Sequence, residues 1–256
     1  MFGGGRYDFR GKDNTDFALW AGAQLQVNGM TKDRVFMKKG GQTVAGSFFT
    51  RVALTVEVSA NMTLHAKILA EQPGSFRLFG SDDAEGLYVN RTSLKIPDLS
   101  LSITPKGEFV LINRGVKVLV QWAKLHTPLN TAGQPVAKDD TSRWYLDVSF
   151  VALDNTMPAV APHGLIGQSF DGSKMTVHGK RDNYGRGRKF KTSAQGEGAI
   201  EGTYEDYIVA GPFATSFKFS RFGVQTPVAP RNVSALAGHK EPKAVGTNAG
   251  SVEDEA

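Results

Sequence analysis

The stretch that decides the fold is Val116-Lys117-Val118-Leu119-Val120-Gln121-Trp122. Three valines and the tryptophan occupy every second position, and Lys117 and Gln121 lie between them. Because successive side chains of a β-strand point to opposite faces, this pattern predicts a strand with one face against a core and one toward solvent. The same alternation recurs at residues 52–58, 99–103 and 144–150.

Glycine-containing turns separate neighbouring strand patterns. Pro105-Lys106-Gly107 lies between the patterns at 99–103 and 109–112, and Asn113-Arg114-Gly115 lies just before Val116. Short connections of this kind between alternating runs predict antiparallel hairpins. No segment keeps the 3.6-residue apolar period of a helix for three turns. The sequence therefore predicts an all-β protein, either an antiparallel β-sandwich or a twisted two-sheet stack, with little helix.

The character of the sequence changes near residue 226. The 256 residues are enough to bury a full core, and we expect one β domain over residues 1–225. From Thr226 onward the aromatic residues end, prolines recur, and the sequence finishes with Glu253-Asp254-Glu255-Ala256. Such a composition predicts a flexible Pro/Gly/Ala-rich tail or linker over residues 226–256.

The composition excludes several functional classes. The protein has no cysteine, which excludes disulfides, thiolate zinc sites and cysteine nucleophiles, and its five histidines lack zinc-ligand spacing. No apolar run approaches the ~20 residues that a membrane span needs. The first twenty residues are rich in charge, so no signal peptide is predicted, and the protein is either intracellular or a mature or excised piece. The net charge of +5 suits either a solvated surface or an anionic partner.

Segments at the two ends of the domain carry a family resemblance. Near the start, Tyr7-Asp8-Phe9-Arg10-Gly11 precedes Phe17-Ala18-Leu19-Trp20, which opens a half-buried strand pattern, and Leu25-Gln26-Val27-Asn28-Gly29 follows. Later come His163-Gly164-Leu165-Ile166-Gly167-Gln168 and a Gly-x-Tyr-x-Asp-Tyr motif at residues 202–207. In this order they resemble the von Willebrand factor type D domain, and more closely its relative, the C-terminal domain of inter-alpha-trypsin inhibitor heavy chains.

This resemblance covers roughly residues 2–222 and implies a non-catalytic extracellular or cell-surface β module for adhesion, matrix or surface assembly. In the heavy chains, the segment similar to residues 25–29 is a short strand with a Val-Asn-Gly turn. The present sequence departs from the family in lacking cysteine and the Gly-Asp-Pro-His segment before the first strand. Heavy chains attach covalently to a glycosaminoglycan at that segment, so we do not expect this activity here. The departures indicate a fragment cut near its domain boundary or a divergent member.

The resemblance also implies a metal site in the loop at residues 164–172. The equivalent loop of type D domains binds calcium through Asn and Asp oxygens, which here makes Gln168 and Asp171 the candidate calcium ligands. Calcium takes about six to eight oxygen ligands, so the first strand pair would have to supply more. The residues available there are Asp13, Asn14 and Asp16. The alternative is a structural turn, without a cofactor, whose glycines adopt positive φ.

Residues 180–191 form the densest charge run. The six basic residues in it are Lys180, Arg181, Arg186, Arg188, Lys189 and Lys191. A loop punctuated by glycine can grip phosphate or sulfate groups, and Tyr184 and Phe190 can stack on sugars or bases. We expect an anionic polysaccharide, or other matrix or surface proteins, as the partner. Nucleic acid is not expected, because no nucleic-acid-binding module accompanies the run. A solvated hairpin loop is the alternative.

Two other functional classes stay open. An enzyme acting on polysaccharide needs an acid–base set in one groove, for which Tyr204, Glu205 and Asp206 are the densest candidates. In a strand, Tyr204 and Asp206 would share a face. Ser169 lies in an incomplete nucleophile-elbow pattern, so we expect no catalytic residue there, and His163 should hydrogen-bond within its turn. The third class, an intracellular scaffold, follows from the missing signal peptide and cysteines.

Overall fold

The computed structural model describes residues 6–80, 87–90, 93–153, 158, 160–170, 177–184 and 187–224, with the backbone alone at 87–90. The protein divides into two units, Met1–Gln225 and Thr226–Ala256. The second unit lies outside the described residues, so the flexible tail at 226–256 stays a prediction. The first unit is described below.

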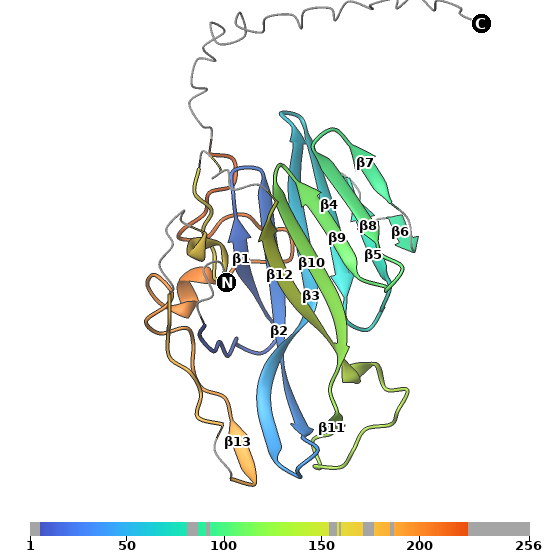
Figure 1. The fold of residues 1–256 in the computed structure, drawn as a ribbon, viewed down its shortest axis with the longest axis vertical. Coiled ribbons are helices and arrows are strands. Elements are labelled where there is room, and N and C mark those ends of the chain that lie inside the picture. The colour runs from blue at the N-terminus through green and yellow to red at the C-terminus, as the bar shows by residue number, and fades with distance from the viewer. Residues whose placement is uncertain are drawn as a thin grey trace, which may run out of the picture. The chain divides into compact units, whose positions relative to one another are not determined.

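The strands form one hydrogen-bonded sheet with two halves (Figure 1). The first half contains β1 (Thr15–Ala21), β2 (Leu25–Met37), β3 (Thr43–Ser59), β4 (Met62–Leu69), β5 (Ser75–Phe79) and β6 (Leu87–Asn90). The second contains β7 (Leu94–Ile96), β8 (Leu99–Ile103), β9 (Phe109–Asn113), β10 (Val116–Lys124) and β12 (Trp144–Ala152). The halves are joined where Leu146 of β12 pairs with Phe49 of β3. Two short strands are added at the sides: β11 (Thr127–Leu129) pairs with β2, and β13 (Lys189–Lys191) with β3.

The main core fills the space between the two halves. Val27 and Leu54 of the first half and Leu111 and Val118 of the second are fully buried in one cluster. The valines of β10 at 116, 118 and 120 are all buried, as the alternation predicts. Burying apolar area of this kind contributes about 25 cal/mol per Å² removed from water. The prediction of an all-β, largely antiparallel fold is therefore confirmed.

The predicted hairpins are present. β8 pairs antiparallel with β9, and β9 with β10. Arg114 and Gly115, between β9 and β10, both have positive φ (42° and 82°), which matches the right-handed twist of the flanking strands. Helix in the described residues is limited to the 3-10 turns η2 (Thr141–Arg143), η3 (Gly167–Ser169) and η4 (Tyr204–Tyr207). No helix in this part of the protein is long and apolar enough to cross a membrane.

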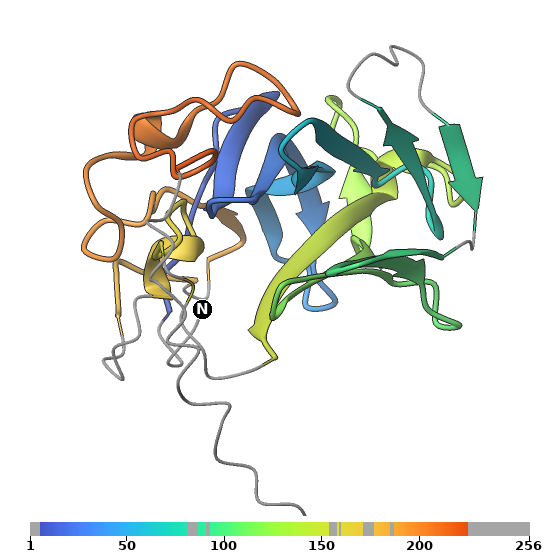
Figure 2. The ribbon, with the colours of Figure 1, turned by 90° about the horizontal axis from the view of Figure 1, so that it is seen from above.

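Strand β1 is buried on both faces, which differs from the half-buried pattern expected for it. Trp20 points into the main core, whereas Phe17 and Leu19 belong to a second cluster with Tyr207 and Phe219. Figure 2 shows the cause: the blue β1 lies between the green strands on one side and the orange C-terminal segments on the other. The described segments around Leu165 and from Ile200 to Phe219, mostly without regular structure, thus form a third layer over the outer face of β1.

The Val27-Asn28-Gly29 segment is not a turn, and that expectation is corrected. It lies within β2, paired with β1 on one side and β3 on the other. Gly29 is needed there because a Cβ would lie 2.8 Å from the Phe49 ring. The buried Asn28 side chain donates to the carbonyl oxygens of Pro212 and Ala214, at 2.9 and 2.8 Å. Asn28 therefore anchors the C-terminal layer to the sheet.

Candidate functional site

The His163–Gln168 motif packs on the backbone of β1. His163 exchanges two backbone hydrogen bonds with Ala21, of 2.7 and 2.9 Å, and the N–H of Leu165 donates to Ala18. Gly164 crosses β1 with φ of +105°, where a Cβ would lie 2.7 Å from the carbonyl carbon and oxygen of Leu19. The motif requires glycine at this position for both reasons.

Gln168 links the two late motifs. Its Nε2 donates to the Gly164 carbonyl oxygen at 3.0 Å, and its Oε1 accepts from the N–H of Glu201 (2.9 Å) and the hydroxyl of Tyr207 (3.2 Å). Both lone pairs of the amide oxygen are thus used within the protein. Asp171, the other candidate calcium ligand, lies outside the described residues. Within the part that is described, no three His, Asp or Glu side chains gather as a metal site. The calcium site stays a prediction.

His163 is held as a neutral ring. The N–H of Gly164 donates to its Nδ1 at 2.9 Å, so the ring proton is on Nε2, which donates to Glu201 Oε2 at 3.1 Å. The ring stacks on Phe219 and Tyr207, with centroids 4.5 and 5.9 Å away. Burial lowers the pKa of His163; the hydrogen bond to Glu201 opposes this, and the charge of Arg221 adds to it. The expectation of a hydrogen bond within the turn is confirmed.

The lowered pKa of His163 predicts a pH dependence of stability. As pH falls through the ordinary histidine value of 6.5, the unfolded state binds a proton before the folded state does, so the free energy of unfolding should decrease. The His163→Gln variant should show a flatter profile between about pH 7 and pH 5 in chemical denaturation. Burial also lowers the pKa of His65, so His65→Gln should remove a separate part of the slope. Parallel profiles for His163→Gln and the wild type would contradict the buried neutral ring.

The Tyr204–Tyr207 segment is a 3-10 turn, which corrects the strand geometry considered for it. Asp206 Oδ2 accepts from the N–H of Thr203 at 2.9 Å and from Lys218 Nζ at 2.9 Å. These two interactions lower the pKa of Asp206, so the carboxylate stays ionised. Tyr207 points into the second core, and its single hydroxyl proton is shared between the Glu201 carbonyl oxygen, at 2.8 Å, and Gln168 Oε1, at 3.2 Å. The segment adopts a 3-10 turn, and this turn brings Tyr207 into the second cluster with Phe17 and Leu19 of β1.

Ser169 is engaged locally. Its Oγ donates to the carbonyl oxygen of Ile166 at 2.7 Å. Both ring nitrogens of His163 are bonded to other groups, namely the Gly164 N–H and Glu201. Ser169 and His163 therefore do not form a nucleophile–base pair in this arrangement.

The six predicted polyanion-binding residues fall into separate places. Lys180 pairs with Glu197, with Nζ and Oε1 2.8 Å apart, and Arg181 lines a pocket beside the N-terminal segment. Arg186 lies outside the described residues. The remaining three, Arg188, Lys189 and Lys191, are exposed at the edge of β3. They occupy a short parallel strand and its approach rather than a hairpin, because the carbonyl of Arg188 accepts from the N–H of Thr43 at 2.8 Å.

The fold places further cations beside these three. Lys38 and Lys39 are exposed in the β2–β3 turn, and Gln42 of that turn donates to the Gly187 carbonyl oxygen at 2.9 Å. Lys38 Nζ lies 5.2 Å from the ring centroid of Tyr184, which packs on Phe190 of β13. We define the basic surface as Lys38, Lys39, Arg188, Lys189 and Lys191. Sequence reasoning missed the two β2–β3 lysines, and only the Lys38-Lys39 pair itself could have signalled them.

Two grooves with basic residues lie along strand β11. The first, of about 640 Å³, is lined by Lys189 and Lys191 of the basic surface together with β11 and the turn after it. The second, of about 510 Å³, lies at the start of β11. Its basic residues are Lys124, His126, Lys138 and Arg143. No Asp or Glu of the described residues lines either groove. Figure 1 shows β11, β13 and the β2–β3 turn at one end of the sheet.

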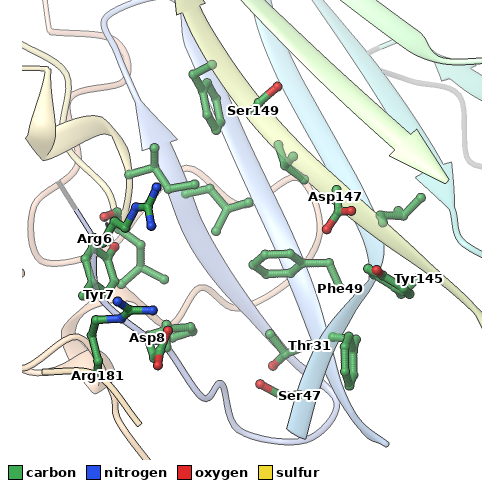
Figure 3. A pocket seen from close by; sticks show the side chains of 18 residues that line it. Arg6, Tyr7, Asp8, Thr31, Ser47, Phe49, Tyr145, Asp147, Ser149 and Arg181 are labelled. Atoms are coloured by element: carbon green, nitrogen blue, oxygen red, sulfur yellow. Dashed lines mark hydrogen bonds between the residues drawn. The ribbon is translucent and has the colours of Figure 1, made fainter. Parts of the chain in front are cut away.

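A third cavity lies where β12 leaves β3 (Figure 3). Its volume is about 640 Å³, within the range of about 300–1,000 Å³ that is common for ligand sites. Phe49 lies on its floor and Asp147 and Ser149 lie on the β12 wall. Arg6, Asp8 and Arg181 lie on the opposite wall.

Comparison with protein-family models, with curated proteins and with solved structures finds no match. The family resemblance therefore rests on the two groups of motifs alone. In the fold, the His163–Gln168 motif and the 202–207 motif touch each other through Gln168 and Tyr207, and both pack on β1.

Proposed function

We propose that this protein is a non-catalytic β module of the von Willebrand type D-like kind, similar to the C-terminal domain of the heavy chains, that binds anionic polysaccharide through the basic surface. Its setting is extracellular or at the cell surface. The observation that carries the proposal is the gathering of exposed lysines and arginines from the β2–β3 turn and β13 at one edge of the sheet.

The geometry suits a long, repeating anion. Lys189 and Lys191 are two positions apart on β13, so they point to the same side, while Phe190 points inward and is half-buried. Lys38 is held beside them through the Tyr184 ring. Several positive charges along one edge produce a positive electrostatic potential that attracts a polyanion. Neighbouring carboxylates would weaken this potential. The groove at the start of β11 offers a second set of cations for a polymer long enough to reach it.

The test is the binding of heparin, a sulfated polysaccharide, measured as a function of salt concentration. The triple variant Arg188→Ala, Lys189→Ala, Lys191→Ala is expected to lose about ten- to a hundredfold in affinity at low salt, at roughly 0.5–1 kcal/mol for each charge. Wild-type affinity should fall steeply as salt rises from about 0.05 to 0.5 M, because screening shortens the range of exposed charges.

The matched control removes three other lysines, at positions 95, 106 and 117, and so causes the same change in net charge. Lys106 lies in the β8–β9 turn, and the other two lie on β7 and β10. This control should bind heparin within about twofold of the wild type, since overall charge alone acts weakly at moderate salt. Equal losses in the two triple variants would reject the basic surface as the site. Equal affinity for single-stranded DNA of matched charge would reject the polysaccharide assignment.

A further inference from the structure

The cavity of Figure 3 is bounded by a strand edge that has no partner strand among the described residues. Strand β12 pairs with β10 along its whole length, from Trp144 to Ala152. On its other edge it pairs with β3 only at Leu146. Beyond that point, no described residue forms a backbone hydrogen bond with this edge. About five residues, 147–151, therefore have no backbone partner on this edge among the described residues, a length of about 16 Å at roughly 3.3 Å per residue.

The residues that line the cavity show that it faces this edge. Six consecutive residues of β12, 145–150, all line it. Successive side chains of a strand point to opposite faces, so a cavity above one face would meet only every second residue. Contact with all six means that the cavity lies beside the strand, in the position of the next strand of the sheet. The opposite wall is a second run, residues 6–9, whose backbone is already bonded to Gly179, Lys180 and Gly196.

The cavity is lined by two arginines and two aspartates. Asp8, on the same wall as the arginines, accepts a hydrogen bond from the N–H of Asp182 at 2.8 Å, whereas the side chains of the other three have no hydrogen-bond or ion-pair partner among the described residues. Arg6 and Arg181 are exposed on one wall, and neither forms an ion pair with a described residue. Asp147, on the β12 wall, forms no hydrogen bond or ion pair within the described part of the protein, and partial burial raises the pKa of its carboxyl. Phe49 supplies an apolar floor between the two charged walls, and Leu19 also lines the cavity but is only 1% exposed.

We infer that this cavity binds an extended peptide segment of a partner protein, which adds as a strand to the free edge of β12. The partner segment alternates apolar and acidic side chains. Its backbone pairs with residues 147–151, its apolar side chains lie on the Phe49 floor, and its acidic side chains face Arg6 and Arg181. Strand addition of this kind takes affinity from main-chain hydrogen bonds and specificity from the pockets for alternate side chains.

Two physical arguments favour a strand over a compact ligand. Natural proteins normally protect an open edge by pairing it, covering it or placing lysine or proline on it, and residues 147–151 carry neither lysine nor proline. Val151, at the end of this edge, is 45% exposed, so an apolar side chain is available next to the unpaired backbone. The site is separate from the basic surface, since the two share no residue.

The probe is the capped peptide Ac-Thr-Val-Glu-Val-Glu-Val-Thr-NH2, titrated into the full-length protein. Its analogue with alternate amides N-methylated keeps every side chain but loses the donors on one edge. We expect saturable binding of the parent peptide, an affinity about tenfold lower or worse for the analogue, and protection of alternate amides in 147–151 from hydrogen exchange. No binding up to millimolar peptide, or equal binding of the two peptides, would overturn the inference.

Variants locate the site. Ser149→Trp fills the cavity and should reduce affinity at least about tenfold, whereas the matched Ser102→Trp, on the outward face of β8 and away from the cavity, should leave it unchanged. Arg181→Glu should lower the affinity for the acidic peptide about two- to fivefold. It should raise the affinity for a peptide with lysine in place of glutamate by a similar factor. The triple variant of the basic surface should bind the peptide normally, so failure of this inference and of the polysaccharide proposal can be told apart. Equal losses in the two Ser→Trp variants would place the peptide elsewhere.

Discussion

Replacing Gly164 by alanine is expected to lower the free energy of unfolding by about 3 kcal/mol or more. The φ of +105° is strained for any residue with a Cβ, and the added carbon would lie 2.7 Å from the carbonyl carbon and oxygen of Leu19. The clash is with backbone, which lacks the rotational freedom of a flexible side chain. Relief requires moving the His163–Gln168 motif off β1, with loss of its hydrogen bonds to Ala18 and Ala21. Urea denaturation monitored by tryptophan fluorescence measures the change.

Gly107→Ala is the matched control. Gly107 also has positive φ, of 81°, but nothing lies within 4 Å of the place that a Cβ would occupy there. Its substitution should cost about 1 kcal/mol, the conformational term alone. The difference between the two variants isolates the cost of the close approach to β1. Equal destabilisation would mean that the contact between Gly164 and Leu19 does not constrain the fold.

Replacing Gln168 by glutamate is expected to destabilise the protein by about 2–3 kcal/mol at neutral pH. The substitution keeps the shape and leaves the oxygen that accepts from Glu201 and Tyr207, but it removes the N–H that donates to Gly164. A carboxylate then faces a carbonyl oxygen across about the same 3.0 Å. The deficit should shrink as pH falls through the range in which the new carboxyl gains a proton, because that proton restores a donor.

The same variant tests the calcium prediction. A carboxylate is a stronger calcium ligand than an amide, so a calcium site at Gln168 and Asp171 predicts that added calcium restores the stability of Gln168→Glu. If Gln168 instead only forms hydrogen bonds within the protein, added calcium should leave the stability of Gln168→Glu unchanged. Gln134→Glu, at an exposed turn position, should change stability by less than about 0.5 kcal/mol with or without calcium. Thermal unfolding with calcium and with chelator distinguishes the two outcomes.

The strand pattern was predictable because it depends on near neighbours. Alternation around Val118 and Leu146 identified β10 and β12, and the turn residues Arg114 and Gly115 identified a hairpin. Period-two alternation, however, identifies only strands that have one apolar and one polar face. Strand β1 has apolar residues on both faces, and its sequence alone could not show that Leu165, Tyr207 and Phe219 cover the second face. Val27-Asn28-Gly29 is a strand segment because β2 pairs with β1 on one side and β3 on the other, contacts that a local pattern does not show.

The candidate sites depended on contacts between distant residues. The charge run at 180–191 is visible as a local cluster, but Lys180 is neutralised by Glu197 and Arg181 faces another cavity. Lys38 joins the run only because β13 pairs with β3. Local alternation is compatible with a strand at Tyr204–Tyr207. The segment is nevertheless a 3-10 turn, which places Tyr207 in the second cluster against β1.

The amino-acid sequence by itself determined the all-β class and the main hairpins, because each follows from side-chain periodicity or from backbone conformations set by adjacent residues. Only the tertiary structure decided that β1 is covered on both faces and that Lys38 lies over the Tyr184 ring, which packs on β13. It also decided that residues 147–151 of β12, without a backbone partner on one edge among the described residues, lie beside a charged cavity. Those features arise from contacts between segments far apart in the sequence, which a local pattern does not encode.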